Sequence, residues 1–118
     1  MKIRGTLLKA LGDQLDPPPH VDPAGLTWGD EVPVTWEFDH NHPIGVGRVE
    51  RMDDGSLEFE AEIPDDFHPV PDGDKFAIGI MTERRDSPTD LISAASIFGV
   101  GLTRRHADPE QPGVRIVR

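Results

Sequence analysis

Apolar and polar residues alternate along several short stretches of this chain, which predicts a mostly β structure. In residues 32–38, four large apolar side chains alternate with Pro33, Thr35 and Glu37. In residues 57–63, four apolar side chains alternate with three glutamates. A period of two places the apolar side chains on one face of a strand and the polar ones on the other. Apolar runs bounded by turn residues predict further strands at residues 2–10, 44–49, 75–82, 91–102 and 114–117.

Turn-forming residues separate these strands. Residues 53–56 read Asp-Asp-Gly-Ser between two alternating runs, which predicts a hairpin because glycine accepts a positive φ. Residues 17–19 are three prolines, which donate no backbone hydrogen bond to a sheet. We therefore expect a proline-rich surface arm at about residues 13–27, pinned to the body by Trp28. Residues 83–90 are charged and predict a turn.

Residues 91–102 form the most continuous apolar run of the chain. Such a run is typical of a strand buried on both faces or of a packed interface, with a turn of helix at residues 90–95 as the alternative. Seven short strands separated by turns predict an all-β fold with little helix, a small barrel or sandwich. The length of 118 residues predicts a single β-rich domain over residues 1–118.

Composition narrows the classes of function. A formal net charge of −10 disfavours binding to nucleic acid, because phosphate repels an acidic surface. The absence of cysteine excludes disulfides, thiolate catalysis and cysteine-bound zinc. No apolar run approaches the length of a membrane span, and the first residues lack the apolar core of a signal peptide. We expect a protein made in the cytoplasm that binds neither membrane nor nucleic acid.

His40 and His42 form the only close histidine pair of the sequence, and Asp39 stands beside them. On a continued strand the two histidines would point the same way, so a metal site is one interpretation. A hydrogen-bonded polar turn is the interpretation we favour, because no further ligand follows at a recognisable spacing. We expect no metal and no other cofactor, since the glycine pairs also lack the third glycine and the helix of a phosphate-binding loop.

Hydroxyl groups and arginines complete the candidate chemistry. Ser96 lies in the apolar run of residues 91–102, where a serine more commonly packs or bonds to a carbonyl than acts as a nucleophile. The pairs Arg84-Arg85 and Arg104-Arg105 stand out on an acidic chain. They indicate contacts with a partner protein or solvated charges rather than a nucleic-acid groove.

Several weak motifs follow one another in a familiar order along nearly the whole chain. They are Ile3-Arg4-Gly5, an apolar strand ending in Trp36-Glu37-Phe38-Asp39, then Pro43-Ile44-Gly45, the acidic hairpin of residues 52–59, Ala77-Ile78-Gly79-Ile80, the run of residues 91–97, and Ala107-Asp108-Pro109. In this order and spacing the chain resembles the tailed-phage prohead proteases, the capsid maturation serine proteases that share a fold with herpesvirus assemblins. The resemblance implies the same fold for this chain.

The resemblance also places the family's catalytic residues on this chain, and both are replaced. The histidine base falls on Phe38 and the serine nucleophile falls on Ala77. A phenyl ring accepts no proton and a methyl group attacks no carbonyl, so the resemblance implies a catalytically inactive relative. A shift in the alignment would instead make His40 the base and Ser96 the nucleophile of an active protease.

From the resemblance we expect a phage capsid component, a minor capsid or decoration protein in the virion. Its partners would be the phage major capsid protein and further copies of itself on the shell. The expected contact residues are Trp28 and Pro18 of the arm and Ile97 and Phe98 of the apolar run. The alternatives are the active protease and a host β-barrel binding module unrelated to capsids.

Overall fold

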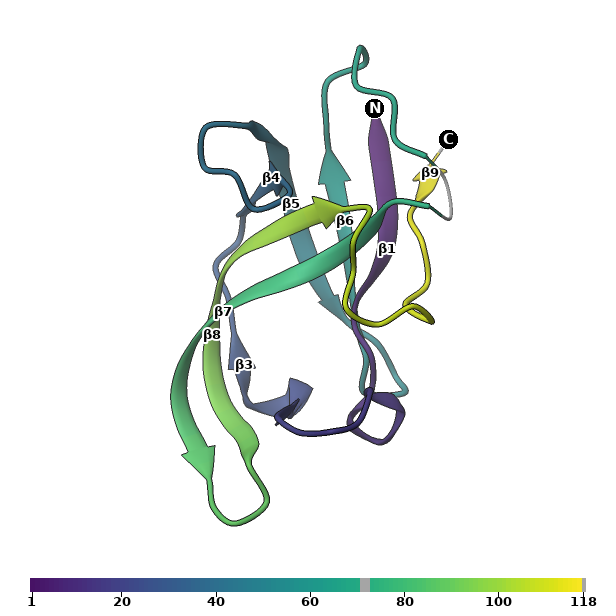
Figure 1. Cartoon of the computed structure of the whole chain (residues 1–118). Helices are drawn as coiled ribbons and strands as arrows, with labels where there is room; N and C mark the ends of the chain where they lie inside the picture. Colours follow the sequence, from purple (N-terminus) through teal and green to yellow (C-terminus); the bar gives the residue numbers. More distant parts are fainter. Residues whose placement is uncertain (71–72, 118) are drawn as a thin grey trace.

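The structure, a computed structural model, describes residues 1–70 and 73–117 and is built almost entirely of strands (Figure 1). The strands are β1 (Lys2–Leu8), β2 (His20–Val21), β3 (Leu26–Thr27), β4 (Val32–Trp36), β5 (Pro43–Arg51), β6 (Leu57–Glu62), β7 (Lys75–Asp86), β8 (Leu91–Thr103) and β9 (Arg115–Val117). The helical segments among the described residues are two short 3-10 turns, η1 (Leu11–Asp13) and η2 (Pro23–Gly25). The predicted all-β fold is confirmed.

All nine strands belong to one sheet, and β8 is the strand on which its two halves meet. One edge of β8 pairs with β7 in an antiparallel hairpin. Its other edge pairs in parallel with β2, β3 and β4 in succession, through Leu91, Ala95 and Val100. From β4 the sheet continues antiparallel through β5, β6, β1 and β9.

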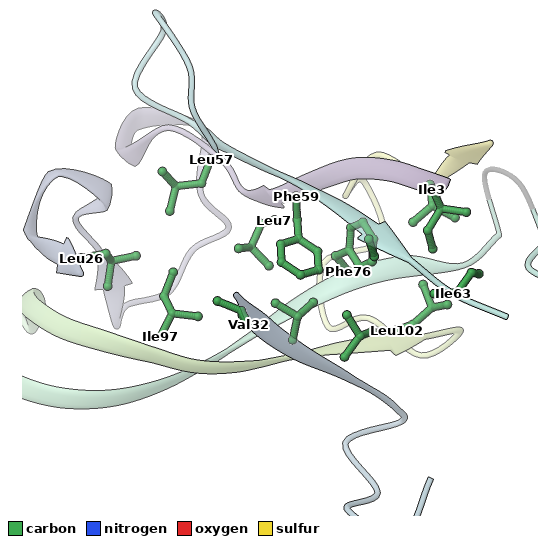
Figure 2. Packing of buried hydrophobic residues seen from close by; sticks show 14 of the residues in the cluster. Ile3, Leu7, Leu26, Val32, Leu57, Phe59, Ile63, Phe76, Ile97 and Leu102 are labelled. Atoms are coloured by element: carbon green, nitrogen blue, oxygen red, sulfur yellow. The ribbon is translucent and has the colours of Figure 1, made fainter. Parts of the chain in front are cut away.

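The inner face of the curled sheet carries the core. Ile3, Phe59, Phe76 and Leu102 are fully buried there, and Figure 2 shows their side chains in one elongated cluster. The rings of Phe59 and Phe76 meet edge to face with 5.1 Å between centroids, an arrangement that aromatic pairs favour. The buried positions of β1, β4 and β6 are the predicted apolar ones. Phe38 is the exception, since it was predicted to share the inward face of β4 and is instead 40% exposed beyond the end of that strand.

The sheet curls until β1 approaches β7, but no ladder among the described residues joins the two strands. The buried amide of Gln111 fills this seam instead. Its Nε2 donates to the backbone oxygen of Thr6 at 2.9 Å and to that of Phe76 at 3.5 Å. The fold is therefore a single curled sheet with an open seam, rather than a closed barrel or a sandwich of two sheets.

The proline arm is tied to the sheet more closely than the sequence predicts. Its two short strands, β2 and β3, both lie along β8. The side chain of Gln14 acts as a bridge across the arm, donating to the oxygens of Lys9 and Val21 and accepting from the Val21 N–H at 2.8 Å. The three prolines lie exposed between these anchors.

Three predicted boundaries differ in the structure. The strand expected to reach Phe38 ends at Trp36, because the backbone turns there. The charged residues 83–86, expected in a turn, extend β7, because Arg84, Arg85 and Asp86 pair with residues of β8. The helical turn considered at residues 90–95 does not form, because β8 pairs with strands on both of its edges there. The Asp-Gly hairpin is confirmed, with Gly55 at φ +90°.

Gly47 permits a close crossing of β5 over the core. A Cβ built on Gly47 would lie 2.5 Å from Cζ of Phe59 and would also collide with the backbone oxygen of Glu60. We predict that Gly47→Ala lowers the free energy of unfolding by about 2 kcal/mol, through overpacking of the core. Urea denaturation measures this change.

Gly99→Ala is the matched control, because a Cβ on this strand glycine would meet no atom closer than 3.8 Å. It should change the free energy of unfolding by less than about 0.5 kcal/mol. Equal losses for the two variants would contradict the packing argument.

Candidate functional site

The turn that follows β4 carries the residues with the most unusual backbone of the chain. Glu37 and Phe38 have φ values of +52° and +59°, a region that side chains other than glycine adopt with strain. The Glu37 N–H donates to the oxygen of Leu102 at 2.9 Å, and the Asp39 N–H donates to the oxygen of Trp36 at 2.9 Å. These bonds turn the chain sharply and direct Phe38 onto β8.

The ring of Phe38 lies over Gly101 of β8. A Cβ on Gly101 would stand 2.5 Å from Cε2 of Phe38, so only glycine leaves room for the ring. Ala77 of β7 is the register partner of Gly101. Paired residues of an antiparallel ladder project from the same face, so the methyl of Ala77 and the ring of Phe38 share one face of the β7–β8 hairpin. The fold thus brings together the two positions singled out in the sequence.

Glu37 lies at the centre of a hydrogen-bond network beside this face. Its carboxylate accepts from the hydroxyl of Thr103 at 2.7 Å and from the N–H of Arg104 at 3.0 Å. Burial disfavours the charged form of Glu37, but these two hydrogen bonds and the charges of Arg105 and Arg104 outweigh it. The pKa of Glu37 is therefore lowered from its ordinary value.

A buried carboxylate anchors the neighbouring loop to the same network. Asp74 is fully buried, and its side chain accepts from the Val70 N–H at 2.7 Å and from Nε of Arg104 at 2.8 Å. The guanidinium of Arg104 also lies 5.2 Å from the ring of Trp36. Arg104 is thus a structural residue here, since both its charge and its flat face are engaged within the molecule.

The structure does not bring His40 and Ser96 together. Ser96 lies in the middle of β8, paired with Met81 and Thr27. His40 lies in the exposed turn beyond Trp36, which pairs with Leu102. Leu102 is six residues along β8 from Ser96, which corresponds to roughly 20 Å of extended strand. A hydrogen bond between a histidine base and a serine nucleophile is out of reach in this arrangement.

Asp39 and His42 form part of a closed polar turn. The Asp39 carboxylate lies 2.6 Å from Nδ1 of His42 and accepts from the Asn41 N–H at 2.9 Å. These hydrogen bonds lower the pKa of Asp39, the bond from the Asn41 N–H most of all. The described residues contain no group of three or more histidines and acids placed to hold a metal ion. The contacts fit the hydrogen-bonded turn that we favoured.

The four expected partner contacts fall in different environments. Pro18 is exposed on the arm, and Phe98 is 53% exposed. Trp28 is half-buried and packs against the core, with the guanidinium of Arg51 5.0 Å from its ring. Ile97 is only 6% exposed and belongs to the core, so its side chain offers little surface to a partner. Strand alternation explains the difference, since Ile97 points inward and Phe98 outward.

Phe98 has exposed apolar neighbours on the same side of the hairpin. Its ring covers Gly79, where a Cβ would lie 3.1 Å from the ring carbons. Met81, two residues from Gly79, is 65% exposed, and Phe38 is 40% exposed. We call this surface the outer face of the hairpin and define it by Phe38, Ala77, Gly79, Met81, Ser96, Phe98 and Gly101. Large exposed side chains gathered over small ones are typical of a protein-binding surface.

Known proteins do not identify the chain. Comparisons with protein-family models, with curated proteins and with solved structures find no match. Within residues 1–70 and 73–117, no helix has the length and apolar character needed to cross a membrane.

A pocket at the seam was not predicted from the sequence. It has a volume of about 210 Å³ and combines apolar side chains of β1, the arm and β7 with Lys9, His106 and Asp108. Lys9 lies 2.8 Å from the Asp108 carboxylate, and Nδ1 of His106 accepts from the Asp108 N–H at 3.0 Å. Burial lowers the pKa of His106. Among the described residues, those that line this pocket include no serine, threonine or tyrosine. Distant segments form it, which is why no local motif signals it.

The Glu37 network predicts a pH-dependent contribution to stability. A carboxylate whose pKa is lowered on folding stabilises the protein above its ordinary pKa, and this contribution is lost as the pH falls through the folded-state pKa. We predict that Glu37→Gln is less stable than the native protein at pH 7, by about 1–2 kcal/mol, because charge-assisted bonds are lost. Near pH 3 the difference should narrow.

Urea denaturation of both proteins at the two pH values measures this effect. Glu110→Gln serves as the control, because the Glu110 side chain is exposed and forms no hydrogen bond among the described residues. A Glu37→Gln deficit that is equally large at both pH values would show that shape, rather than charge, explains the loss.

Proposed function

We propose that this protein is a phage capsid component, a minor capsid or decoration protein, which uses a maturation-protease-like fold for binding instead of catalysis. One observation carries the proposal. The positions that correspond to base and nucleophile in the resemblance, Phe38 and Ala77, share one face of the β7–β8 hairpin, and both are apolar. That two positions so far apart in the chain meet in space supports the alignment behind the resemblance.

The hydroxyl of Thr103, which follows Gly101 on β8, is already engaged in hydrogen bonds. Thr103 offers the hydroxyl nearest in sequence to Gly101, but it donates to Glu37 and accepts from the Arg105 N–H at 2.9 Å. Glu37, with its lowered pKa, is a weak base. A hydroxyl held in this way and a carboxylate that stays ionised do not make an activated nucleophile.

Exposed apolar surface gives the same face a role in binding. Phe38, Met81 and Phe98 would each bury a large side chain in a complex, and rigid aromatic groups contribute strongly to binding energy. The phage major capsid protein is the partner that the resemblance favours. A host binding module could use the same face, so binding to shells is the property that separates the two hypotheses.

Co-sedimentation tests the capsid proposal. We expect the purified protein to pellet with shells assembled from the major capsid protein of the same phage, and Phe98→Ser to weaken this binding about tenfold or more, as loss of an aromatic anchor does. Val46→Ser is the matched control, because Val46 is a comparably exposed apolar residue on β5, away from the outer face.

Failure of the native protein to pellet with shells would refute the capsid proposal. Equal losses for the two variants would refute the assignment to the outer face.

A serine-directed fluorophosphonate probe tests the absence of catalysis. We expect no labelling of the native protein. Ser96 lies in the middle of β8 with a paired strand on each side, whereas the turn that holds His40 lies beyond the end of β4, beside Leu102. Labelling that maps to Ser96 by mass spectrometry and disappears in His40→Ala would establish the active protease instead.

A further inference from the structure

The edge of β7 that faces away from β8 has no partner strand among the described residues. The approach of β1 to this edge ends near Phe76, whose backbone oxygen receives the long hydrogen bond from Gln111. Beyond that point, the backbone groups of residues 77–86 bond to no segment other than β8 in the described chain. Figure 1 shows the lower part of this hairpin extending past the rest of the sheet.

A free edge of this kind accepts one type of occupant. Its outward N–H and C=O groups are spaced for an extended backbone, and a strand that joins the sheet satisfies them in a regular ladder. Water satisfies them in the isolated chain. The edge therefore selects for a β-strand rather than for a helix or a small molecule.

The protection along this edge is uneven. Near the tip of the hairpin, the register shifts between Thr82 and Arg84, so Glu83 forms a bulge. Residues 83–86 are all charged. Bulges and charges of this kind prevent edge-to-edge pairing. Residues 77–82, Ala-Ile-Gly-Ile-Met-Thr, have no charge, no proline and no bulge on β7. This segment is the open part of the edge, and it includes the 65% exposed Met81.

The distribution of charge indicates which strand fits. Residues 77–82 carry no charged side chain, whereas the chain as a whole carries a formal net charge of −10. Arg84 and Arg85 are paired within the hairpin with Asp86 and Asp90. Two copies that meet through most other surfaces would set carboxylate against carboxylate. The hairpin is the part of the molecule where two copies approach without that repulsion.

We propose that two copies of this chain pair edge to edge through residues 77–82 of β7, antiparallel and related by a twofold axis. One contact of this type satisfies the free edges of both copies and joins β8, β7 and their symmetry mates into a continuous sheet. It also places the exposed Met81 side chains beside the partner strand. The pairing uses the backbone edge of β7 and leaves Phe38 and Phe98 of the outer face open, whereas Met81 belongs to both surfaces.

Sedimentation velocity of the purified protein over a range of concentrations tests the pairing. We expect a reversible dimer for the native protein. Met81→Lys places a charge on each of the two paired edges and should raise the dissociation constant about tenfold or more. Val46→Lys makes the same change of charge at an exposed site on β5, a strand with partners on both edges, and should leave the dissociation constant unchanged. Circular dichroism establishes that both variants are folded.

Hydrogen exchange then locates the contact. The outward amides within residues 77–82 should exchange more slowly in the native dimer than in Met81→Lys. A native protein that stays monomeric up to about 1 mM would overturn the proposal, as would a dimer that Val46→Lys weakens as much as Met81→Lys, or one whose edge amides show no added protection. A native protein that stays monomeric and gains protection of the outward amides within residues 77–82 only when it binds capsid shells would assign the edge to the shell protein and also overturn the pairing of two copies.

Discussion

The whole sheet depends on the pairing of β8 along both of its edges. A strand of thirteen residues offers backbone donors and acceptors on two sides, and each buried group has to be satisfied. One side is filled by β7, the strand immediately before β8, and this pairing costs little to form because a short turn joins the two strands. The other side needs β2, β3 and β4, which come from far earlier in the sequence. The long proline arm is therefore a structural part of the sheet.

The position of the candidate site follows from the same pairing. Because β4 runs parallel to β8 and ends beside Leu102, the turn of Glu37 and Phe38 is delivered to the outer face of the hairpin. Gly101 leaves room for the ring of Phe38. Thr103 and Arg104 donate hydrogen bonds to the carboxylate of Glu37. Two residues in a strained backbone region are thereby stabilised by contacts from another strand, as such strain requires. The result is an apolar ring fixed over Gly101 of β8.

Local patterns predicted the strands well and the connections poorly. The alternation in β1, β4 and β6 gave the correct inward faces, and Asp-Gly gave the correct hairpin. The two-residue strands β2 and β3 are too short to produce a period, and their pairing depends on β8. The charged end of β7 was expected to turn, because charge correlates with exposure and a projecting strand is as exposed as a loop.

The same distinction between local pattern and tertiary pairing applies to the candidate site. The sequence alone determined that Phe38 and Ala77 cannot transfer a proton or attack a carbonyl, because the chemistry of a side chain does not depend on its surroundings to that degree. Only the tertiary structure decided that Phe38 covers the partner of Ala77, that His40 and Ser96 lie apart, and that Ile97 is buried while Phe98 and Met81 are exposed. The physical reason is that a local period fixes which residues share a face of their own strand, whereas the neighbours of that face are set by pairings between residues distant in the chain.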